Sequence, residues 1–212
     1  MDYTSDKVVN FKEKFENTVR KYIQRDGIEN ILTFLASTDF YEAPASTKYH
    51  GAYKGALAEH SLNVFNCLMK SEFLKDIKNE ETGTQMYSNE TIAIVALFHD
   101  LCKADFYGVA MRNAKNANGV WVKVPYYTVE DKYPYGHGEK SVYLLMREGL
   151  KLTDEEALAI RWHMSGFTDS VKGGSYSLNE AYNISPLAVE LALADMRATY
   201  LLENNKDDLI KI

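Results

Sequence analysis

The chain of 212 residues has little of several things that would place it in a special class of protein. Its two cysteines, Cys67 and Cys102, are too few for a disulfide framework and are not spaced as a CxxC pair. Gly 12 and Pro 4 are too few for a collagen-like or low-complexity chain. The longest apolar runs, such as 91–98, fall far below the ~20 residues that cross a bilayer. We therefore expect a globular protein that does not span a membrane.

Positive charge is also in short supply, with Lys+Arg 24 against Asp+Glu 30 and a formal net charge of -6. Long nucleic acid is disfavoured as the main partner, because tracking many phosphates requires a concentrated Lys/Arg surface. The N-terminal residues are charged and contain no apolar signal segment, so we expect a cytoplasmic protein. At about 150 residues per domain, the length and the absence of internal repeats predict a single domain over residues 1–212. Oligomeric state is not predicted.

Most of the sequence has the period of amphipathic helices. Val8, Phe11 and Phe15 begin one such stripe. Helix starts are indicated by Ser88, by a capping box at Thr153, and by Ser185 before a proline. The predicted helices span 7–24, 29–35, 55–72, 90–103, 138–149, 154–164 and 186–203.

One segment breaks the helical pattern. Residues 118–129 carry an Asn-Gly turn followed by β-branched and aromatic residues, which predicts a hairpin inserted near 107–130. Pro125 keeps its second strand at an edge. The predicted fold class is therefore all-α, a helical bundle with a small inserted β-hairpin.

Two aspartates fall where the pattern predicts burial. Asp195 shares one face of its helix with apolar residues at steps of three or four: Leu187, Leu191, Ala198 and Leu202. Asp100 lies with His99 in the last turn of the apolar helix 90–103. A buried carboxylate is costly unless it is paired or bound to a cation, and these helices offer few basic partners beyond Arg161 and Arg197.

Histidines accompany these aspartates. His60 and His99 lie on helices, His163 closes the helix 154–164, and His137 lies at a helix start. A single histidine on an apolar face is more often a hydrogen-bonded core residue than a ligand. The whole set, with two inward aspartates, instead indicates a metal site within a helical bundle, suited to Mn, Fe, Co, Ni or Zn.

The arrangement resembles a known family. His60, then His99-Asp100 in Leu-Phe-His-Asp-Leu-Cys-Lys, then Asp195 in Leu-Ala-Asp-Met-Arg, is similar to the HD superfamily of metal-dependent phosphohydrolases. The resemblance extends from about residue 50 to residue 201, and Lys103 falls where the HDxxK form has its lysine. It is greatest to stand-alone bacterial HD hydrolases and more distant to the HD domain of OB-fold-linked 3′-5′ exoribonucleases.

The resemblance implies a hydrolase with an HD-type bundle, in which His60, His99, Asp100 and Asp195 hold one divalent metal. His137 and His163 fall in the order seen in members that bind a second ion, although the double histidine common in those members is missing. Mg is a further candidate cation. The implied reaction cleaves a phosphomonoester or phosphoanhydride of a nucleotide or similar small metabolite. Asp100 and Lys103 are the implied catalytic residues, and the predicted substrate contacts are Lys103, Arg161, Lys140, Lys54, Arg112 and Trp121.

Other hypotheses remain open at this stage. The ligand set also suits a phosphodiesterase or exonuclease on short nucleic acid, a di-iron oxygenase of HD type, or a non-catalytic metal-binding module. On the hairpin, Arg112, Lys115 and Lys123 could form a basic rim, with Trp121, Tyr126 and Tyr127 stacking on a base. Alternatively, these aromatic residues only seal the hairpin onto the helices.

Overall fold

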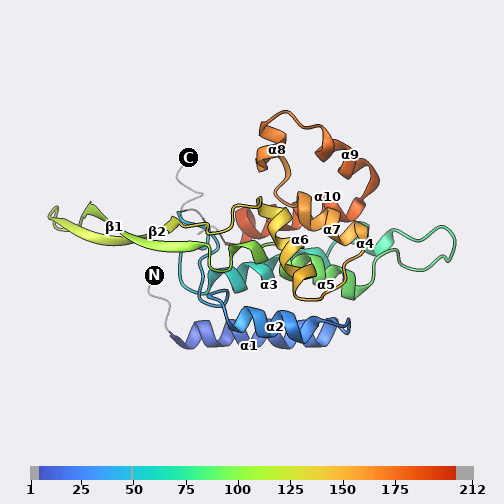
Figure 1. Cartoon of the computed structure of the whole chain (residues 1–212), viewed down its shortest axis with the longest axis horizontal. Helices are drawn as coiled ribbons and strands as arrows, with labels where there is room; N and C mark the ends of the chain where they lie inside the picture. The colour runs from blue at the N-terminus through green and yellow to red at the C-terminus, as the bar shows by residue number, and fades with distance from the viewer. Residues whose placement is uncertain (1–4, 49, 204–212) are drawn as a thin grey trace.

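A computed structural model describes residues 5–48 and 50–203 and is mainly helical (Figure 1). The α-helices are α1 (Ser5–Tyr22), α2 (Ile28–Ala36), α3 (Ala56–Met69), α4 (Glu72–Asp76), α5 (Asn89–Phe98), α6 (His137–Arg147), α7 (Asp154–Trp162), α8 (Asp169–Lys172), α9 (Ser177–Ile184) and α10 (Pro186–Arg197). Short 3-10 turns occur at η1 (Leu101–Lys103) and η2 (Ser165–Phe167), and a π-helical turn, η3, at Ala198–Leu202. Within this described part, no helix combines the length and apolarity needed to span a membrane.

The predicted helix starts are confirmed by their capping hydrogen bonds. Ser88 accepts from the backbone N–H of Thr91 at 3.0 Å. Thr153 and Glu156 form a reciprocal capping box, with hydrogen bonds of 2.9 and 3.1 Å. These side chains satisfy N–H groups that have no partner within the helix itself. The short helices α4, α8 and α9 were not predicted, since four to eight residues give too little periodic pattern.

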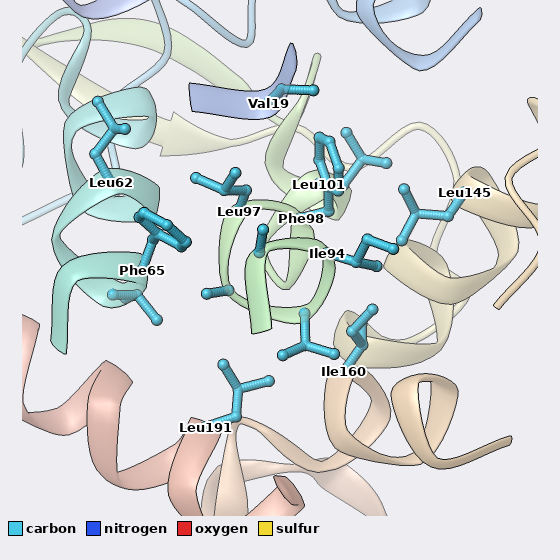
Figure 2. Close-up of a cluster of buried hydrophobic side chains, with 14 of the residues drawn as sticks. Val19, Leu62, Phe65, Ile94, Leu97, Phe98, Leu101, Leu145, Ile160 and Leu191 are labelled. Atoms are coloured by element: carbon cyan, nitrogen blue, oxygen red, sulfur yellow. The ribbon is translucent and has the colours of Figure 1, made fainter. Parts of the chain in front are cut away.

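Helix α5 lies at the centre of the hydrophobic core. Every residue from Ile92 to Phe98 is buried, which explains why this helix is apolar on all sides. Figure 2 shows side chains of neighbouring helices converging on it, including Leu62 and Phe65 of α3 and Leu191 of α10. The core thus fixes the position of the C-terminal end of α5, where His99 and Asp100 follow.

Strands β1 (Tyr107–Lys115) and β2 (Trp121–Val129) form the predicted antiparallel hairpin. Their register runs from the pair Tyr107–Val129 to the pair Lys115–Trp121. Gly119 in the connecting turn has φ +76°, a conformation that favours glycine. The hairpin projects from the helical body, at the left of Figure 1.

The C-terminal helix differs from its prediction. Instead of continuing regularly to residue 203, α10 ends at Arg197 and is followed by the π-helical turn. The backbone N–H of Glu203 donates to the carbonyl of Ala198 at 3.0 Å, a bond five residues apart. The wider turn shifts the register, so Leu202, predicted to be buried on the Asp195 face, is 58% exposed.

Candidate metal centre

Three separate helices bring the four predicted ligands together. His60 lies within α3, Asp195 lies within α10, and His99 and Asp100 follow the last turn of α5. The His60 Nε2 atom lies 3.2 Å from Asp195 Oδ1, 3.3 Å from His99 Nε2 and 3.6 Å from Asp100 Oδ2. The four side chains thus lie close together. Two overlapping sets here can each hold a metal ion, namely His60 with His99 and Asp100, and His99 with His163 and Asp195.

Asp100 lies between two groups of histidines. Its Oδ2 atom lies 3.4 Å from His99 Nε2, on the His60 side. Its Oδ1 atom lies 2.9 Å from His137 Nε2 and 3.4 Å from His163 Nε2. One carboxylate can therefore serve two adjacent cation positions, and the histidines predicted for a second ion lie beside it.

Backbone contacts orient the histidine rings. The Nδ1 atom of His99 bonds to the carbonyl of Ala96 at 2.8 Å, and that of His163 to the carbonyl of Ile160 at 2.6 Å. A carbonyl only accepts, so Nδ1 carries the proton and, in the neutral ring, Nε2 presents a lone pair. This is the tautomer that a metal ligand needs.

The buried Nε2 atom of His163 bears on whether a cation fits this site. It has no hydrogen-bond partner in the part of the chain that the structure describes. It lies 3.4 Å from Asp100 Oδ1, and either a proton on Nε2 or a cation close to both atoms makes this contact favourable. Imidazole and carboxylate donors in this arrangement fit a divalent transition metal.

Negative charge dominates the electrostatics of the cluster. Burial by itself raises the pKa of Asp100, but Lys103 and His99 outweigh burial and hold that pKa well below its usual range. Burial by itself lowers the pKa of His60, but Asp195 and Glu203 outweigh it and raise the pKa to about 10. The carboxylates thus stay ionised, and in the metal-free protein Lys103 and a protonated His60 lie beside them as positive partners.

Lys103 contacts the carboxylate of Asp100. Its Nζ atom donates to Asp100 Oδ2 at 2.7 Å and to the carbonyl of Ala45 at 2.8 Å. Burial by itself lowers the pKa of Lys103, but the charge of Asp100 outweighs burial and raises it. The lysine therefore keeps a fixed positive charge beside the candidate metal centre.

Glu203 is a member of the site that sequence analysis missed. Both of its carboxylate oxygens lie 3.0 Å from His60 Nδ1, and Asn63 donates to it at 3.0 Å. Only the π-helical turn brings Glu203 to this place, and no local sequence signal marks that turn. His50, which the sequence places in a loop, also lies close, with its ring 5.2 Å from that of His60.

Substituting Glu203 with glutamine is expected to weaken metal binding by about 10- to 100-fold, as loss of an outer carboxylate–histidine contact typically does. The glutamine loses the charge that holds the His60 ring with Nε2 toward the other ligands. Titration of metal-free protein with Mn²⁺ or Co²⁺ measures the change. Exposed Glu180→Gln is the control. Unchanged affinity in Glu203→Gln would show that the contact does not position His60.

Three of the other predicted substrate contacts form ion pairs with carboxylates outside the four ligands. Lys140 pairs with Asp131 at 2.7 Å, and Lys54 pairs with Glu42 at 3.0 Å. Arg161 pairs with Glu139 and helps to line a separate pocket between α6 and α7. The last two, Arg112 and Trp121, lie on the hairpin.

Comparisons of this chain with protein-family models, with curated proteins and with solved structures find no match. The function is therefore inferred from the geometry of the site and the resemblance of its motifs.

Proposed function

We propose that this protein is a metal-dependent phosphohydrolase of HD type, which hydrolyses a phosphomonoester or phosphoanhydride of a nucleotide or similar small metabolite. The observation that carries the proposal is the close approach of His60, His99, Asp100 and Asp195 to one another, with a lysine alongside. A divalent cation in such a set acidifies a water and polarises a phosphoryl oxygen. The site contains no thiolate cluster of the kind that closed structural zinc sites use.

The chain's own residues supply orientation and charge for this reaction. Asp100 stays ionised between the two groups of histidines, so it can orient cations on both of its oxygens. Lys103 holds a positive charge next to Asp100, where it can contact a phosphoryl oxygen of the substrate. Two of its three N–H groups bond to Asp100 and to the carbonyl of Ala45 in the described part of the chain, which leaves the third for such a contact. Phosphoryl transfer depends chiefly on such positioning and charge stabilisation.

Exposure indicates the side from which a substrate would approach. The side chains of His60, His99, His163 and Asp100 are at most 2% exposed, whereas those of Asp195 and His137 are 17% and 25% exposed. Asp195 and His137 are therefore the members of this set that solvent reaches most, and a substrate would approach past them. A mostly buried centre favours a small phosphorylated group over the middle of a polymer.

The test is metal analysis of the purified protein together with a panel of nucleotides and phosphomonoesters under Mn²⁺, Co²⁺, Ni²⁺, Fe²⁺, Zn²⁺ and Mg²⁺. We expect release of phosphate from at least one compound, lost on chelation and restored by metal. No release across the panel from metal-loaded protein would refute the proposal. Turnover that requires O₂ would identify an oxygenase, and metal-dependent folding without turnover would identify a binding module.

A further inference from the structure

The hairpin of β1 and β2 carries a charge pattern opposite to that of the rest of the chain. Residues 107–129 contain three basic residues, Arg112, Lys115 and Lys123, and no aspartate or glutamate. The chain as a whole has a formal net charge of -6. This projecting element therefore has a net positive charge because it lacks carboxylates (Figure 1), and the acidic composition of the whole chain does not describe this surface.

One face of the outer hairpin exposes apolar and basic side chains together. Opposed residues of an antiparallel pair point to the same face, and alternate pairs share it. The register therefore places three successive exposed pairs on this face: Lys115–Trp121, Asn113–Lys123 and Met111–Pro125. Trp121 is 65% exposed and Met111 is 56% exposed. Trp121 thus does not seal the hairpin onto the helices.

Cations lie next to aromatic rings on both faces. The Nζ atom of Lys115 lies 5.4 Å from the centre of the Trp121 ring, and the Arg112 guanidinium lies 5.5 Å from that of Tyr126 on the opposite face. An exposed aromatic ring beside a cation offers a base a stacking surface with a phosphate contact next to it.

We propose that the outer half of this hairpin binds single-stranded nucleic acid. Trp121 stacks on a base, Lys115 and Lys123 contact phosphates on the same face, and Arg112 contacts a phosphate where the strand passes the hairpin edge to the opposite face. This goes beyond the proposed hydrolysis of a small substrate, which needs no such arm. A protein partner fits less well, because lysine is depleted from the cores of protein interfaces and Lys115 and Lys123 flank the tryptophan here. Duplex fits less well because its bases are already stacked.

The test uses the full-length protein in EDTA and a fluorescently labelled single strand of about 12 nucleotides, within the range of known single-strand site sizes. Fluorescence anisotropy is expected to show binding that weakens with salt. Three phosphate contacts at ~0.7 each predict a slope of log K against log salt of about −2. A duplex of the same sequence is expected to bind more weakly, and equal binding would overturn the stacking contact.

Two variants test the residues. Lys115→Ala with Lys123→Ala is expected to reduce the slope to about −0.7, and Trp121→Ala to weaken binding by about 5- to 100-fold. The matched control is Lys75→Ala with Lys172→Ala, which removes the same charge from exposed positions on α4 and α8. Circular dichroism melting checks that all variants fold alike.

Three results would overturn the proposal. They are no binding at about 50 mM salt, where phosphate contacts are strong, hairpin variants that bind as well as the wild type, or hairpin variants that dissociate an oligomer in light scattering. The last result would identify a second copy of the chain as the occupant. Because EDTA removes metal-dependent turnover from the assay, failure here would leave the proposed phosphohydrolase function untouched.

Discussion

Substitution of Asp100 with asparagine is expected to remove tight metal binding and to lower metal-dependent hydrolysis by at least about 1,000-fold. Asp100 faces histidines on both of its oxygens, so its loss affects both candidate cation positions. A cation at such a site contributes several kcal/mol to transition-state stabilisation, and each 1.36 kcal/mol corresponds to about tenfold in rate. An amide has no negative charge with which to hold the cation.

Metal content after gel filtration, together with the phosphate-release assay, measures this effect. The control is Asp169→Asn, since the side chain of Asp169 is fully exposed on α8 and paired only loosely with Lys172 at 3.8 Å. Melting of the metal-free proteins separates loss of metal from loss of fold. If Asp100→Asn kept both its metal and its activity, Asp100 would not be a ligand and the proposed centre would be wrong.

The burial of Asp100 could be predicted from the apolar helix that precedes it, and the inward direction of Asp195 could be predicted from helical phase alone. A carboxylate that interrupts an apolar stripe at a step of four must point where the stripe points. The same holds for capping residues such as Thr153, whose hydrogen bonds are local. Features that depend only on residues three or four positions apart could thus be predicted from the sequence.

Glu203 and the partners of the basic residues could not be predicted in this way. The π-helical turn places Glu203 in contact with His60, which is 143 residues away in sequence. Lys54 and Arg161 were predicted as substrate contacts because a sequence displays charge but not its pairing. Their partners Glu42 and Glu139 are set by the packing of loops and helices. Ion pairs between residues far apart in sequence could not be predicted from the sequence alone.

The second large effect concerns stability, at an ion pair far from the metal centre. Glu156 in α7 is fully buried, and Arg25 bonds both of its oxygens, at 2.5 and 3.0 Å. Removing one partner of such a pair leaves an uncompensated buried charge. We expect Arg25→Met to lower the free energy of unfolding by about 3 kcal/mol. Arg20→Met, which removes the solvent-accessible ion pairs of Arg20 with Glu16 and Glu29, is the control and is expected to cost about 1 kcal/mol.

Urea denaturation of the metal-free proteins measures both values, and a further variant identifies the cause. Glu156→Gln in the Arg25→Met background removes the buried charge but keeps an oxygen for the backbone N–H of Thr153, so the capping box is retained. It is expected to recover most of the lost stability. If the double variant is as unstable as Arg25→Met, the loss instead comes from the other contacts of Arg25, with the carbonyl of Lys151 and with Glu90. If Arg25→Met unfolds like the wild type, the pair does not hold the N-terminal segment against α7.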